Sequence, residues 1–378
     1  MSHRLWMAPC ICAAIVAGHA TTALASWQIV SSPEPQGTNY AQLTGTVATG
    51  AGSAWAVGYA RTGNNPYRAL IERWSASSWS LAQSAAVKAS DTTFLNGTAE
   101  TSGSDVWAVG SDATTADNPP HGLIEHWNGV SWTRNPVATG EPAGSTLLAV
   151  SADSTSDAWA VGYTNNASTF GFTPLIEHFT GTSWRAVPGA AAYPVSGHDR
   201  LLAVAALGPT DVWAFGVTGE HPDPVIEHFN GSVWSIVSQP ASGYDTFLDG
   251  VTAISSTNIW AVGGTEVTNT LIEHWNGSSW SIVASPNVTG AGSVLNYLTG
   301  ASALGANDIW AVGTTDNNST GETLTEQWNG SKWSITPSPD SGSSGLDSVS
   351  GLAGGPLFAV GIGDNTAGIP SPLVLQHF

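Results

Sequence analysis

One stretch of sequence decides the fold, and in its third copy residues 147–162 read LLAVSADSTSDAWAVG. In each of seven copies, a leucine is followed twelve residues later by the aromatic residue that opens a Trp-Ala-Val-Gly-like tetrad. The pairs are Leu43/Trp55, Leu95/Trp107, Leu147/Trp159, Leu201/Trp213, Leu248/Trp260, Leu298/Trp310 and Leu346/Phe358. A second motif, LIEHFTGTSW at residues 175–184, has counterparts after the other tetrads. Repeats of about fifty residues are typical of propeller arrays.

Each repeat predicts four short strands: one from the leucine, one at the tetrad, one at the Leu-Ile-Glu-His run and one from the closing tryptophan. A hairpin of the type Asn276-Gly277-Ser278-Ser279 joins the last two, because asparagine and glycine tolerate positive φ. Many short, evenly spaced strands favour blades around an axis. The sequence therefore predicts an all-β, seven-bladed propeller of four-stranded antiparallel blades over residues 26–378. The blade cores are expected to start near residues 43, 95, 147, 201, 248, 298 and 346.

The two ends of the repeat region complement each other. The seventh repeat stops after its third strand, at Phe378, whereas residues 26–33 copy a fourth strand of the type seen at 281–286. We therefore expect the N-terminal strand to complete the last blade. Closing the ring would remove the exposed sheet edges that promote aggregation.

The Trp-Ala-Val-Gly and His-Trp-Asn-Gly-Ser-Ser-Trp motifs carry a family resemblance that covers Trp27 to Phe378. The chain resembles kelch-like and galactose-oxidase-type propellers, and more closely a class of secreted bacterial proteins with these repeats. The double-glycine signature of kelch blades is missing. The copper site of galactose oxidases needs a cysteine-crosslinked tyrosine, and the two cysteines here are Cys10 and Cys12. The resemblance implies the fold but not a function, since propellers host enzymes, lectins and scaffolds alike.

Residues 1–25 predict a secretory signal, with Arg4 near the start, an apolar stretch, and a small-residue cleavage site at Ala23-Leu24-Ala25. We expect a secreted or extracytoplasmic monomer with no transmembrane segment after signal cleavage. Both cysteines fall within the signal. The formal net charge of −19 disfavours nucleic acid and anionic membranes as partners.

The repeated Glu-His pair, as in Glu177-His178, suggests metal or acid–base chemistry. Neighbouring residues on a strand point to opposite faces, and the copies are spread one per blade, so they cannot converge on one ion. We interpret the histidine as the donor of a structural hydrogen bond to the neighbouring blade, and the repeat tryptophans as inter-blade packing. No metal site is predicted.

Two spacings vary between repeats, and they locate the predicted binding face. The distance from tetrad to second motif ranges from 11 to 16 residues, and the distance from closing tryptophan to next leucine from 13 to 18. Both variable segments open on the same face of a propeller. Most tyrosines fall there, in predicted connections, and tyrosine suits sugar faces and protein partners. The predicted ligand-binding residues are Tyr40, Tyr67, Arg68, Tyr193, His198, Asp199, Arg200, Tyr244, Asp245 and Tyr297.

These patterns leave two functions open. The first is a recognition scaffold that binds an extracellular glycan or protein. The alternative is an enzyme acting on glycosides or polysaccharides over the central channel, centred on residues 193–200, with His198 as acid or base. No cofactor is expected, although Ca²⁺ is an alternative at a ring of oxygens before the inner strands. The oxygens would come from Asn39, Asp91, Asp199, Asp245 and Asn296, which also suit solvated turns.

Overall fold

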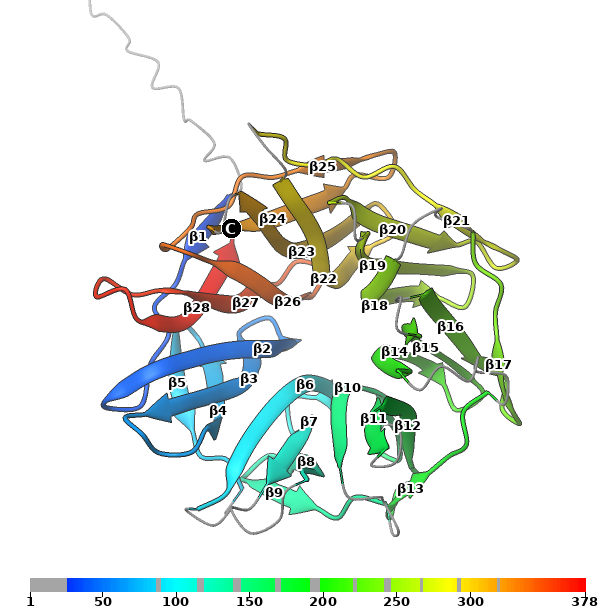
Figure 1. Cartoon of the computed structure of the whole chain (residues 1–378), viewed down its shortest axis with the longest axis horizontal. Helices are drawn as coiled ribbons and strands as arrows, with labels where there is room; N and C mark the ends of the chain where they lie inside the picture. Colours follow the sequence, from blue (N-terminus) through cyan, green and yellow to red (C-terminus); the bar gives the residue numbers. More distant parts are fainter. Residues whose placement is uncertain are drawn as a thin grey trace, which may run out of the picture.

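Seven four-stranded sheets surround a central channel in the computed structural model, which confirms the predicted seven-bladed propeller (Figure 1). The structure describes residues 26–85, 90–113, 119–138, 144–166, 171–190, 198–219, 223–240, 246–265, 268–290, 294–317 and 320–378. The predicted signal, residues 1–25, lies outside the described residues. Among those described, no helix is long and apolar enough to cross a membrane.

Each of the first three blades consists of four consecutive strands, ordered from the channel outward. Blade 1 comprises β2 (Thr38–Gly50), β3 (Ser53–Thr62), β4 (Arg68–Ser75) and β5 (Ser78–Ala82). Blade 2 comprises β6 (Thr92–Ser102), β7 (Asp105–Ala113), β8 (His121–Trp127) and β9 (Trp132–Asn135). Blade 3 comprises β10 (Ser145–Ser154), β11 (Asp157–Asn166), β12 (Gly171–Phe179) and β13 (Trp184–Ala186).

The next three blades repeat this order. Blade 4 comprises β14 (Arg200–Gly208), β15 (Asp211–Thr218), β16 (Asp223–Phe229) and β17 (Trp234–Ile236). Blade 5 comprises β18 (Thr246–Ser255), β19 (Asn258–Thr265), β20 (Thr270–Trp275) and β21 (Trp280–Ile282). Blade 6 comprises β22 (Val294–Gly305), β23 (Asp308–Asn317), β24 (Gly321–Trp328) and β25 (Trp333–Ile335).

Blade 7 is built from both ends of the described chain. Its strands are β26 (Gly345–Gly351), β27 (Leu357–Asp364), β28 (Pro370–His377) and the N-terminal β1 (Trp27–Ile29), which lies beside the C-terminus in Figure 1. Trp27 pairs with His377, and Ile29 with Leu375. The predicted closure by the N-terminal strand is therefore confirmed.

The tetrad tryptophans fill the interfaces between blades, as predicted. Trp107 is 1% exposed, and its ring lies 4.9 Å from that of Phe179 and 5.2 Å from that of Trp184 in the next blade. The same triad recurs around the ring, for example where Trp260 meets Trp328 and Trp333. Edge-on and tilted aromatic pairs of this kind add stabilisation beyond their buried area.

The tetrad glycine permits a bulge in every inner strand. In blade 3, Leu147 pairs with Gly162 but Ala149 pairs with Val161, so Leu148 is left unpaired. A Cβ added at Gly162 would lie 2.0 Å from the carbonyl oxygen of Thr146, a separation that real Cβ atoms do not adopt. Only glycine therefore allows the two strands to approach this closely beside the bulge.

The repeated Glu-His pair is structural, but the predicted direction of its contacts is wrong. The histidine contacts its own blade: His178 stacks on Trp159 at 3.8 Å between ring centroids, and its Nε2 lies 2.9 Å from Asp157. The glutamate reaches the neighbouring blade instead, as Glu177 accepts a hydrogen bond from the backbone N–H of Ala138. The histidine ring lies on its own tetrad tryptophan, because the two residues are cross-strand partners in adjacent strands.

Candidate functional site

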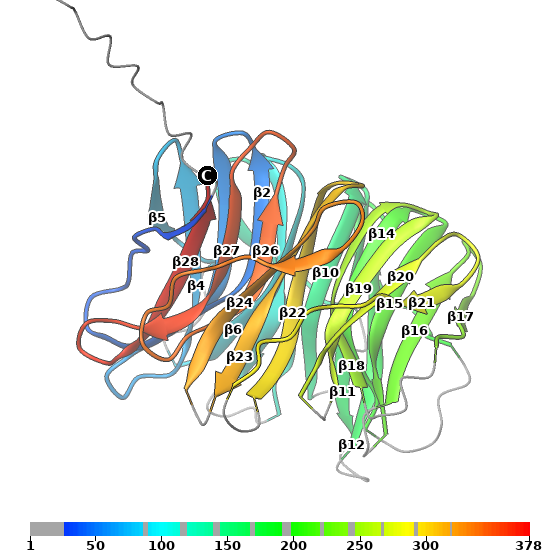
Figure 2. The same cartoon turned by 90° about the horizontal axis from the view of Figure 1, so that it is seen from above.

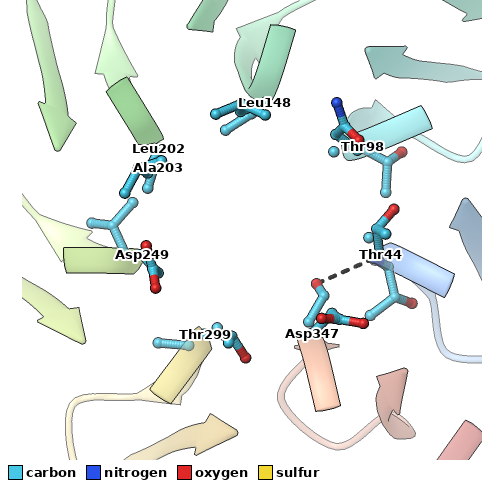
Figure 3. A pocket seen from close by; sticks show the side chains of 18 of the residues that line it. Thr44, Thr98, Leu148, Leu202, Ala203, Asp249, Thr299 and Asp347 are labelled. Carbon is cyan, nitrogen blue, oxygen red and sulfur yellow. Dashed lines mark hydrogen bonds between the residues drawn. The ribbon is translucent and has the colours of Figure 1, made fainter. Parts of the chain in front are cut away.

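The central channel is lined by the residues that the seven bulges turn inward. Each immediately follows the repeat leucine, and Figure 3 shows their side chains around a cavity of about 390 Å³. The ring consists of Thr44, Asn96, Leu148, Leu202, Asp249, Thr299 and Asp347. The bulge thus converts one position of the scaffold repeat into a set of seven side chains that face a common space.

Three of the ring residues donate a hydrogen bond to the carbonyl of the repeat leucine in the next blade. The hydroxyl of Thr44 donates to the carbonyl of Leu95 at 2.7 Å, and Thr299 donates to Leu346 in the same way at 2.6 Å. The amide of Asn96 donates to Leu147 at 2.8 Å. An ionised aspartate cannot donate, so the two ring aspartates do not make this blade-to-blade contact.

The ring is divided into an apolar arc and an acidic arc. Leu148 and Leu202 are neighbours in the ring. Asp249 lies beside Leu202, and the acidic arc runs from it through Thr299 to Asp347 on the side away from Leu148 (Figure 3). Burial raises the pKa of Asp249 to about 6, against an opposing effect of the Arg200 charge. Burial also raises the pKa of Asp347 to about 6. Both carboxyls are therefore largely ionised above neutral pH and largely protonated near pH 5.

A hydrogen-bond chain links Asp347 to two tyrosines at one end of the channel. The Gln42 amide donates to Asp347 Oδ2 at 2.7 Å, and its carbonyl oxygen accepts bonds from the hydroxyls of Tyr40 at 3.0 Å and Tyr59 at 2.9 Å. Burial raises the pKa of both phenols, so they remain protonated donors. Gln42 is held at both ends, which fixes the orientation of the carboxylate.

The same tyrosines belong to an aromatic cluster between blades 1 and 2. Tyr40 and Tyr59 stack at 6.0 Å, and Tyr67 meets each of them edge-on at 5.6 Å. Phe94 of β6 completes the cluster, and the Arg61 guanidinium lies 4.9 Å from the centre of the Tyr67 ring. All lie at the end of the ring where the blade-to-blade connections run, opposite the tight turns between first and second strands (Figure 2). We call this end the channel mouth.

The structure brings together only part of the predicted binding set. Tyr40 and Tyr67 are in contact within the aromatic cluster, whereas the half-buried Tyr297 lies in blade 6. Tyr40 and Tyr297 are strand residues of β2 and β22, so the placement of these two in connections is wrong. Arg68 donates to the backbone carbonyl of Asp91 at 2.8 Å. Tyr193, Tyr244 and Asp245 lie outside the described residues.

The described part of the 193–200 segment, residues 198–200, contacts neighbouring loops and strands on its own side of the ring. The buried Asp199 accepts a bond from the Gly219 N–H at 3.1 Å, and its own N–H donates to Phe172. His198 lies edge-on to the Phe172 ring at 6.0 Å, and Arg200 is exposed. The enzyme hypothesis stays a prediction.

Two asparagines of the proposed ring of oxygens hydrogen-bond to backbone groups of nearby connections. Asn296 is 2% exposed; its Oδ1 accepts from Val288, and its Nδ2 donates to Thr268 and other carbonyls. The Asn39 amide donates to Gly63. Within the described ranges, no group of three or more histidine, cysteine, aspartate or glutamate residues is placed to hold a metal ion. Both asparagines are strand residues, of β2 and β22, and Asn296 is buried, so the interpretation of these two as solvated turn residues is wrong.

The channel ring was missed in the sequence because it lies inside the constant part of the repeat. One signal could have revealed it: the residue after the repeat leucine varies from leucine to aspartate, while the residue before it is always leucine and the residue after it is always small. Alternation alone would not place this residue in the channel, since a bulge shifts the side-chain pattern by one position.

Comparisons with known proteins assign the fold. No family model matches the chain, and no curated protein matches it. Among solved structures, one described as YCF48 bound to D1 peptide shares 15% identity over 95% of this chain and 99% of its own, with a TM-score of 0.55. A chain of the mitotic checkpoint complex shares 12% identity over 92% and 93%, with a TM-score of 0.53. The fucose-specific lectin of Aleuria aurantia shares 15% over 79% and 96%, with a TM-score of 0.47. The chain is a β-propeller repeat protein, similar in fold to the YCF48 structure and to the chain of the mitotic checkpoint complex.

Proposed function

We propose that this chain is a secreted recognition scaffold that binds a polypeptide segment at the channel mouth. The ligand inserts a cationic side chain, lysine or arginine, into the channel. The observation that carries the proposal is the Asp347 carboxylate, which Gln42 and two tyrosines hold toward a cavity whose opposite wall is apolar.

The two arcs of the ring complement the two parts of such a side chain. The methylene stem would pack on Leu148 and Leu202, while the charged head would meet Asp249 and Asp347. A formal net charge of −19 would raise the local concentration of a basic ligand and increase its association rate. The tyrosine cluster would provide a rigid aromatic surface for the segment outside the channel. The similar fold of YCF48, which is described with a bound D1 peptide, supports the choice of a polypeptide ligand.

The first test is binding of a library of basic, neutral and acidic peptides, with a glycan array and a panel of glycosides measured in parallel. We expect basic peptides to bind and the Asp347→Asn variant to bind them at least tenfold more weakly. Asp223→Asn is the matched control, because Asp223 is exposed, does not line the channel and removes the same charge. Selective capture of a glycan, turnover of a glycoside, or equal peptide binding by both variants would contradict the proposal.

The pH dependence provides a second test. Because the pKa of Asp249 and of Asp347 is raised to about 6, lowering the pH from 7.5 to 5 protonates both carboxyls. We expect affinity for a basic peptide to fall over this range, and to fall less in the Asp249→Asn/Asp347→Asn variant. If the affinity changes equally with pH in the two proteins, as measured by isothermal titration calorimetry, the channel carboxyls do not contact the ligand.

A further inference from the structure

A second cavity lies outside the channel, between blades 1 and 2. Its volume of about 510 Å³ is within the range of roughly 300–1,000 Å³ that small-molecule sites occupy. The strand β5, the segment that follows it and the β8–β9 turn contribute its walls. Arg73, Trp55, Trp127 and the 84% exposed Val130 are among its lining residues. We call it the rim groove.

The rim groove contains a residue that departs from the repeat. Blades 2 to 4 have a histidine at this position, bonded to the aspartate two residues before the tetrad tryptophan, as in His228 and Asp211 at 2.8 Å. Blade 6 keeps the pair as Gln327 and Asp308. Blade 1 has Arg73 in place of the histidine and Ser53 in place of the aspartate. The exchange adds a permanent positive charge and removes the carboxylate that would neutralise it.

The Arg73 guanidinium therefore has aromatic neighbours and, among the described residues, no counter-ion. Its central carbon lies 5.2 Å from the centre of the Trp55 ring and 5.5 Å from that of Trp127. In the described part of the chain, its buried Nε has no hydrogen-bond partner, and no carboxylate lies within ion-pair distance. Arg134 in blade 2 differs, because it forms an ion pair with Asp112 at 2.8 Å. A buried donor without a partner is costly, so the site favours a ligand that brings acceptor oxygens.

We propose that the rim groove binds a single hexuronate residue of an otherwise neutral glycan, with the sugar carboxylate on Arg73. A guanidinium presents parallel N–H donors that match the two oxygens of a carboxylate. The ring face of a sugar, with its exposed C–H groups, would pack on the exposed side chains of Leu81 and Val130, because the indoles of the groove are buried. Serine hydroxyls at Ser80 and Ser131 lie along the same walls and suit the sugar hydroxyls. This site is separate from the channel and does not depend on the function proposed above.

The test compares D-glucuronate with D-glucose by ligand-observed NMR and calorimetric titration. Wild-type protein should bind glucuronate at least tenfold more tightly than glucose. The Ser53→Asp/Arg73→His variant restores the pair that blades 2 to 4 use, so it should fold and lose the preference. Ser53→Asp alone should weaken glucuronate binding by giving Arg73 an internal partner. Arg134→Gln is the matched control, because it removes the same charge at an arginine that is already paired.

Three outcomes would overturn the proposal. Glucose and glucuronate could bind equally, which would remove the role of the carboxylate. The Ser53→Asp/Arg73→His variant could bind glucuronate as tightly as wild type, which would remove the role of Arg73. An acidic peptide could bind in the groove more tightly than D-glucuronate, which would make the ligand a protein. Asp347→Asn should leave glucuronate binding unchanged, so failure at one site is distinguishable from failure at the other.

Discussion

Replacing Gly313 with alanine tests whether the tetrad glycine is required by the bulge beside it. A Cβ at Gly313 would lie 2.0 Å from the carbonyl oxygen of Tyr297 and 2.8 Å from the Cα of Leu298. Contacts shorter than 3.0 Å are not seen for real Cβ atoms, so the inner strand would have to move by about 1 Å. Overpacking that moves backbone typically costs about 1–3 kcal/mol, and we expect a loss near the upper end of that range.

Gly305 in the same blade provides the control. An added Cβ there meets nothing within 4 Å, so Gly305→Ala should be neutral or stabilise by up to about 1 kcal/mol through the unfolded chain. Urea unfolding followed by tryptophan fluorescence gives both free energies of unfolding. Comparable values for the two variants would refute the reasoning. Movement of β22 would also disturb the bond from Thr299 to Leu346, so Gly313→Ala should alter the channel as well.

Trp27→Ala should lower the free energy of unfolding by about 3–5 kcal/mol, because Trp27 is 4% exposed and packs on Trp310 at 5.3 Å; an unchanged urea midpoint would contradict the closure. Burial raises the pKa of Glu326 to about 8, so its contribution to stability is complete below the unfolded pKa of about 4.5 and is lost as pH rises through 8. Between pH 5 and 7, the free energy of unfolding of the wild type should therefore fall by roughly 2–3 kcal/mol relative to that of Glu326→Gln. Parallel plots of unfolding free energy against pH for the two proteins would show that Glu326 does not titrate in this way. His178→Gln should change stability by less than about 1 kcal/mol, because Gln327 already makes the equivalent bond in blade 6; a larger loss in thermal unfolding would mean that histidine stacking is required.

The fold could be predicted because its contacts repeat at fixed sequence distances. The pairing of Leu147 with Gly162 and the contact of Trp107 with Trp184 recur in the other blades with little change. A repeat that each blade must satisfy against its neighbours leaves a strong periodic pattern in the sequence. The N-terminal strand was identifiable for the same reason, since Trp27 fits the position that closes each blade.

The site could be predicted less well, because it depends on local geometry that the repeat does not reveal. The bulge that turns Asp347 into the channel is invisible in the alternation of apolar and polar residues. Tyr40 was assigned to a connection because β2 extends several residues upstream of Leu43. Threonine and tyrosine favour extended backbone, which is consistent with the longer strand.

The last blade pairs two strands, β1 and β28, that lie far apart along the chain. At about 5–20 residues per second, the 350 residues that separate Trp27 from His377 take roughly 20–70 seconds to appear. Until then β1 has no partner, and the tetrad ring of Trp310 lacks the indole that covers it. Blades 1 to 6 can assemble in order during synthesis, but the ring itself can close only after β28 is present. Closure therefore depends on β28: a chain that stops before this strand keeps an open sheet edge and an uncovered tryptophan, both of which promote aggregation.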